Sequence, residues 1–142
     1  MKRIRIYGCT HEDNLKKHIR CASECFIQCL IPLKKKYDIT ITLCNNLMDK
    51  EGIYGECWKE DKNNSYCIRI EKSLPMKKII LTLAHEFVHI KQFAKGELKF
   101  LTKHDIWNGK VFYHDHNYID APWEKEASEF EEILYDAWKE LL

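Results

Sequence analysis

The residues best suited to chemistry in this sequence are two histidines and a glutamate in the segment His85-Glu86-Phe87-Val88-His89. Four residues of α-helix turn by about 400°, so His85 and His89 would project from nearly the same side of a helix. Two such imidazoles can bind one zinc ion. Glu86 would lie beside the ion, where it can take a proton from a zinc-bound water. The spacing therefore predicts a zinc site with a general base next to it.

A zinc ion that activates water needs a third protein ligand and an open fourth position. The segment that begins at Pro122 opens a predicted final helix and contains Glu124 and Glu126, which point about 200° apart. We expect Glu124 to be the third ligand, because it shares a helical face with the small residue Ala127. Glu126 is the alternative, and both acids also suit the first turn of a helix that holds no metal. Three histidines of the preceding segment are further alternatives: His104, His114 and His116.

The pattern His85-Glu86-x-x-His89 followed by Glu124-x-x-Ala127 resembles the HExxH…ExxA arrangement of gluzincin metallopeptidases. It is similar to that of CAAX-prenyl proteases, ImmA/IrrE-like proteins and minimal gluzincins, and the chain also looks like small phage and microbial proteins labelled SprT-like. The resemblance covers about residues 75–130 and is specific for zinc chemistry rather than for a substrate. It implies a zincin-like fold, with His85, His89 and Glu124 as ligands and Glu86 as the general base.

The sequence departs from the gluzincin pattern at one position. Many gluzincins have Asp or Asn four residues after the ligand glutamate, where it can steady a metal-binding histidine. Here that position is Ser128, which can accept a hydrogen bond but carries no charge. SprT proteins use a third histidine in place of the glutamate, so the resemblance keeps the three histidines of the segment before the final helix open as ligands.

Two further expectations concern catalysis and substrate binding. Amide hydrolysis passes through an oxyanion, which a hydrogen-bond donor beside the zinc stabilises. Tyr118, six residues before Glu124, is our candidate for this donor, and an aromatic side chain that packs the loop is the alternative. An edge strand beside the metal can bind an extended peptide by main-chain pairing, and we expect residues 65–71 to form that strand.

The elements that must position these residues follow from hydrophobic periodicity. Helices are predicted over about 11–36, 75–95 and 122–142, where apolar residues recur at helical spacing. Strands are predicted over about 3–7, 38–44, 52–58 and 65–71, while residues 97–120 show an irregular pattern. We therefore expect an α+β fold in which a small antiparallel sheet packs against the N-terminal helix, the histidine helix and the C-terminal helix.

Length, charge and composition restrict the class of protein. The 142 residues suggest a single domain, 1–142, and the net charge of +1 makes a nucleic-acid partner an unfavoured expectation. No apolar stretch approaches the roughly 20 residues that span a bilayer, and the N-terminus lacks a signal segment, so we expect a cytoplasmic protein without a membrane partner. The seven cysteines include no CxxC pair, which favours reduced thiols over a disulfide framework or a thiolate zinc site.

The leading hypothesis from the sequence is a zinc-dependent metallopeptidase that acts on a peptide or protein substrate. One alternative is a zinc-binding regulatory or interaction module with little activity, which the small size favours. Another is a DNA-associated protease of the SprT kind. That reading needs a basic surface, and the chain offers only two short lysine runs, 34–36 and 77–78.

Overall fold

The computed structural model describes residues 2–10, 14–31, 35–114 and 120–142, which form four helices and two sheets. The helices are α1 (Asn14–Leu30), α2 (Leu47–Glu51), α3 (Met76–Ala94) and α4 (Pro122–Lys139). The strands are β1 (Lys2–Tyr7), β2 (Tyr37–Cys44), β3 (Gly55–Lys59), β4 (Ser65–Glu71), β5 (Leu98–Phe100), β6 (His104–Trp107) and β7 (Lys110–Tyr113). The predicted mixture of helices and strands is confirmed. Helix α1 ends earlier than its apolar pattern predicts, since Pro32 cannot donate a helical hydrogen bond.

The larger sheet is mixed, which corrects the prediction of an antiparallel sheet. Its strand order is β1-β2-β4-β3. Strand β2 pairs in parallel with both β1 and β4, and only the β3–β4 hairpin is antiparallel. The long connection through α1 lets β1 and β2 run in the same direction, as parallel neighbours require. Alternation of apolar and polar residues shows that one face is covered, but it does not show strand direction, which explains the error.

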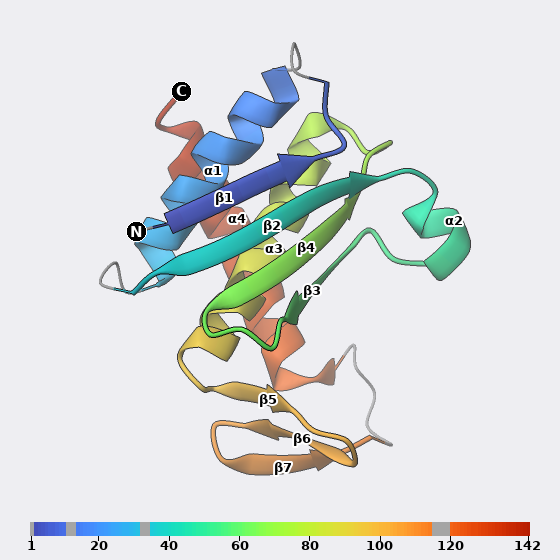
Figure 1. Ribbon diagram of the computed structural model, residues 1–142, viewed down its shortest axis with the longest axis vertical. Helices are drawn as coiled ribbons and strands as arrows, with labels where there is room; N and C mark the ends of the chain where they lie inside the picture. Colours follow the sequence, from blue (N-terminus) through green and yellow to red (C-terminus); the bar gives the residue numbers. More distant parts are fainter. Residues whose placement is uncertain (1, 11–13, 32–34, 115–119) are drawn as a thin grey trace.

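The three long helices lie on one face of the larger sheet (Figure 1). In β2, Tyr37, Ile39, Ile41 and Leu43 are buried, whereas the residues between them are half-buried on the open face. Helices α1 and α3 contact the sheet, and α4 packs against both of these helices. The main core therefore lies between the sheet and α3, which places one side of α3 toward β3 and another toward α4.

A small antiparallel sheet of β5, β6 and β7 lies between α3 and α4 in the chain. Figure 1 shows it at the end of the molecule where α3 ends and α4 begins. The sequence pattern predicted no strand in residues 97–120, and these three strands show that this prediction is wrong. Asn108 and Gly109 both have positive φ, 48° and 82°, as a two-residue hairpin turn requires. This sheet packs on Trp123 in a second core that includes Leu98 and Ala121.

Neither disulfide bonds nor membrane-spanning helices contribute to this fold within the described ranges. The cysteines there are free. No helix in these ranges is both long enough and apolar enough to cross a membrane.

Candidate metal centre

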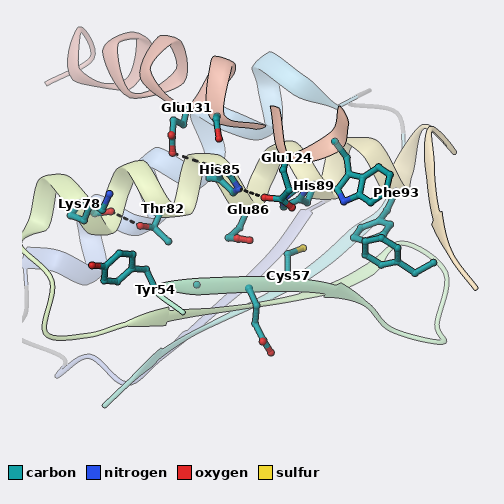
Figure 2. A pocket seen from close by; sticks show the side chains of 15 residues that line it. Tyr54, Cys57, Lys78, Thr82, His85, Glu86, His89, Phe93, Glu124 and Glu131 are labelled. Carbon is teal, nitrogen blue, oxygen red and sulfur yellow. Dashed lines mark hydrogen bonds and ion pairs between the residues drawn. The ribbon is translucent and has the colours of Figure 1, made fainter. Parts of the chain in front are cut away.

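His85 and His89 lie one turn apart on the side of α3 that faces α4. The opposite side of the helix packs into the main core through Ile80, Leu83 and Phe87, which are fully buried. Because apolar residues fix the rotation of α3, both imidazoles enter a shared cleft instead of the core. Their ring centroids are 5.0 Å apart. The predicted orientation of the two rings toward one point is thus confirmed (Figure 2).

Glu124, in the first turn of α4, closes this cluster. Its Oε1 lies 3.0 Å from His85 Nε2, and its Oε2 lies 3.0 Å from His89 Nε2. One ligand atom from each of the three residues falls within 4.8 Å of the other two. Two imidazole nitrogens and a carboxylate oxygen at this separation can hold one metal ion. The structure therefore brings together the three predicted ligands from two helices.

The far side of each imidazole is held by a second residue. His89 Nδ1 donates a hydrogen bond of 2.8 Å to Oε1 of the fully buried Gln92. The Gln92 amide is itself fixed, since its Nε2 donates to the Trp123 carbonyl and to Glu126 Oε1. Only the oxygen of Gln92 can thus face His89, so Nδ1 keeps its proton and Nε2 presents its lone pair to the cluster when the ring is neutral.

Glu131 has the corresponding place beside His85. Its Oε2 lies 3.5 Å from His85 Nδ1, on the side opposite Glu124. The motif resemblance to gluzincins would put Ser128 in this role, and Ser128 does line the cleft. In this chain the charged partner comes one helical turn later. Sequence reasoning missed Gln92 and Glu131, although both share a helical face with a predicted ligand: Gln92 with His89 and Glu131 with Glu124.

The alternative third ligands are engaged elsewhere or lie outside the described residues. Glu126 Oε1 accepts a 2.8 Å hydrogen bond from Lys91 Nζ, which directs it away from the two imidazoles. His114 Nε2 lies 3.1 Å from Oδ1 of the buried Asp105. Neither His104 nor His114 belongs to the metal-binding group found in the described part of the chain. His116 lies outside the described residues, and so does Tyr118, the predicted oxyanion donor.

Glu86 lies on the floor of the cleft, with its carboxylate between α3 and β3 (Figure 2). The side chain is 4% exposed, and this burial raises its pKa to about 7. Strand β3 brings the half-buried Cys57 to the same place, where burial and the nearby Glu86 charge raise the pKa of the thiol well above its ordinary value. Glu86 can therefore take up and release a proton near neutral pH next to the metal-binding cluster.

The charges of the cluster balance one another. Burial opposes protonation of His85, but hydrogen bonds to Glu124 and Glu131 outweigh it and raise the pKa of the imidazole to about 10. Burial also opposes ionisation of Glu124, yet the hydrogen bonds from His85 and His89 hold the pKa of its carboxyl at about 2. Two imidazoles thus surround one ionised carboxylate. A divalent cation could replace the protons that these imidazoles direct at the carboxylate.

The cluster opens into a cleft of about 430 Å³. One end is polar and is lined by Tyr54, Lys78 and Thr82, whereas the other end is aromatic and is lined by Phe93. The ring of Phe100, which also lines the cleft, lies 5.6 Å from that of Phe93. Strand β3 forms the wall opposite α3. The expectation that residues 65–71 form the edge strand is wrong, because β4 pairs on both sides and β3 lies at the edge of the sheet.

Comparisons of the chain with models of protein families, with curated proteins and with solved structures found no match.

Proposed function

We propose that this protein is a zinc-dependent peptide hydrolase of the gluzincin type, with a zincin-like arrangement of sheet and helices. The observation that carries the proposal is the convergence of His85, His89 and Glu124 around one point, beside a buried glutamate in an open cleft. Two imidazoles and one carboxylate are a donor set of catalytic zinc, and the open side of the cleft leaves room for a fourth ligand.

Each residue of the cluster has a distinct role in this proposal. When bound, zinc supplies a Lewis acid that polarises the scissile carbonyl and makes water more acidic. Glu86 accepts the proton of the attacking water and passes it to the leaving amine. Gln92 and Glu131 keep His89 and His85 in the orientation that binds the ion.

The edge strand β3 is the proposed binding site for the backbone of the substrate. Its outer edge carries backbone groups that do not pair with β4, and residues 54–57 line the cleft at the level of Glu86. An extended peptide could add to this edge by main-chain hydrogen bonds. Tyr118 stays a prediction for the donor that would stabilise the oxyanion.

The decisive experiment combines metal analysis with peptide cleavage. We expect one zinc ion per chain in the wild type and in Glu86→Gln, and a reduced zinc content in His85→Ala and Glu124→Ala. Cleavage of an unfolded-protein or peptide pool should fall by about 10²–10⁴-fold in Glu86→Gln, since the general base is lost while the ligands stay. Glu132→Gln, on the exposed side of α4, is the matched control and should cleave like the wild type.

Two results would contradict parts of the proposal. Undiminished cleavage by Glu86→Gln would remove this residue from the reaction. A zinc-loaded wild type that cleaves no peptide would instead favour a zinc-binding regulatory module.

A further inference from the structure

A second cavity, of about 530 Å³, continues the metal cleft at its aromatic end. Phe93 and Phe100 line both cavities, so the two cavities adjoin at these side chains. In β3 and the residues that flank it, residues 54–57 border the metal cleft and residues 58–61 border the second cavity. The two cavities therefore lie next to one another beside the edge strand.

The second cavity exposes large apolar side chains to solvent. Phe100 is 49% exposed, Leu101 is 45% exposed and Trp58 is 37% exposed, and all three border it together with the buried Leu98. Exposed apolar side chains that gather around one cavity are typical of a binding site. The charged residues Lys59, Asp61 and Lys99 lie around the same cavity. Its chemistry thus suits an apolar side chain attached to a polar backbone.

The residues of β3 that border each cavity show how far the second cavity lies from the proposed site of cleavage. Cys57 borders the metal cleft beside Glu86, whereas Lys59, the last residue of β3, and Glu60 after it border the second cavity. Two or three residues of extended chain span about 7–10 Å. A peptide paired with the edge of β3 and cleaved beside Glu86 would therefore place its third or fourth residue from the scissile bond in the second cavity.

We infer that this cavity is a distal substrate subsite, which selects peptides that carry a large apolar side chain three or four residues from the cleaved bond. The inference rests on the proposed peptide hydrolysis, because it assigns the substrate class of that site. Leu101 is the residue that tests it best, since it borders the second cavity, does not line the metal cleft and is half exposed.

The experiment uses alanine-rich dodecapeptides in which a single Phe is moved along the chain, with the all-alanine peptide as reference. Cleavage by the zinc-loaded wild type is mapped by mass spectrometry, and binding to zinc-loaded Glu86→Gln is measured by fluorescence anisotropy. We expect cleavage and binding to improve about tenfold when Phe stands three or four residues from the bond, on one side of it only. Leu101→Ser should abolish this preference. Ile133→Ser, which removes a similarly exposed aliphatic residue from α4, should keep it.

The possible outcomes distinguish a failure of the subsite proposal from a failure of the proposed hydrolysis. Cleavage that does not depend on the position of Phe, or a preference that survives Leu101→Ser, would overturn the subsite and leave the proposed function intact. Position-dependent binding to Glu86→Gln without any cleavage by the wild type would support the subsite and contradict hydrolysis. If no peptide is either bound or cleaved, both proposals are wrong.

Discussion

At the scale of single residues, the proposed metal centre would depend on side chains that are not themselves ligands. Gln92 is buried between α3 and α4, and its amide can face His89 in only one way because Trp123 and Glu126 accept from its nitrogen. This fixed amide decides which nitrogen of His89 carries the proton. A bare pair of histidines on a helix would have no such control over the tautomer.

Replacing Gln92 by Leu should therefore weaken zinc binding while leaving all three ligands in place. We expect the dissociation constant for zinc to rise by about 10–100-fold, as is typical when a partner of a ligand histidine is lost. Competition with a chromophoric chelator measures this constant. Gln28→Leu, the same change at an exposed position of α1, is the control and should bind zinc like the wild type. Equal affinities in the two variants would mean that Gln92 does not orient His89.

The sequence predicts the ligands better than it predicts the residues around them. His85, Glu86 and His89 share one helix, so their geometry follows from helical spacing alone. Glu124 could be inferred only as a partner from a second helix, and Glu126 was a close alternative. The choice between them depends on how α4 packs on α3, which directs Glu126 to Lys91. Gln92 and Glu131 gain their roles through that same packing. Hydrophobic periodicity in the sequence does not predict how two helices pack.

At the scale of elements, the close approach of β3 to α3 shapes the cleft. A Cβ atom added at Gly55 would lie 2.6 Å from Thr82 Cγ2 and 3.1 Å from the backbone oxygen of Arg69. No side chain larger than that of glycine fits there without a shift of the strand or the helix. Glycine at this position thus lets β3 lie next to the turn of α3 that precedes His85 and Glu86.

Gly55→Ala should destabilise the protein by about 1–3 kcal/mol, because the added methyl group overpacks the contact between β3 and α3. Thr82→Ser removes the Cγ2 atom while keeping the hydroxyl that donates to the Lys78 carbonyl. In the Thr82→Ser background the cost of Gly55→Ala should be clearly smaller. Chemical denaturation of the four proteins in this cycle measures the difference. The same cost in both backgrounds would show that Thr82 is not the obstacle.

Glu71, at the end of β4, stabilises the start of α2 in a way that depends on pH. Its carboxylate accepts hydrogen bonds from the Met48 N–H at 2.9 Å and from the N–H and hydroxyl of Ser73. These bonds lower the pKa of the carboxyl in the folded protein, the Met48 bond most of all. A lowered folded pKa means that the stabilisation is complete above the ordinary pKa of a glutamate and is lost as the pH falls below it.

Glu71→Gln should consequently lower the thermal midpoint at pH 7, and the difference from the wild type should shrink as the pH falls below about 4. Thermal unfolding followed by circular dichroism between pH 3 and pH 7 tests this expectation. Glu24→Gln, at an exposed position of α1, should show no such dependence. A gap between Glu71→Gln and the wild type that stays constant with pH would exclude the proposed role of the carboxylate.

Elements were easier to predict than their pairing. Long amphipathic segments predict α3 and α4 well, since a helix buries one face whatever it packs against. Strand direction and order depend on connections and long-range contacts, so the parallel pairing of β1, β2 and β4 was missed. The identity of the edge strand depends on the same order. The short strands of the smaller sheet were missed because each is only three or four residues long.

At the scale of the whole molecule, a bound ion should stabilise the fold. The unfolded chain does not hold His85, His89 and Glu124 together, so we expect zinc to bind the native state preferentially. At a free zinc concentration 100 times the dissociation constant, the gain in the free energy of unfolding should be about 2.7 kcal/mol. Differential scanning fluorimetry should show a rise in the melting temperature with zinc that a chelator reverses.

Two controls make this prediction specific. Magnesium should give little shift, because imidazole ligands suit zinc and not the harder cation. Glu124→Ala should lose most of the shift with zinc. An equal shift in Glu124→Ala and in the wild type would mean that zinc stabilises the protein from another site.

The route of the chain through the metal centre has a consequence for biosynthesis. The polypeptide leaves the cluster after His89, builds the smaller sheet and returns with Glu124, which lies 39 positions after His85. During translation the two histidines emerge from the ribosome well before their carboxylate partner. We therefore expect the nascent chain to bind no ion until α4 has docked on α3, so that occupancy of the site would report on this late docking step.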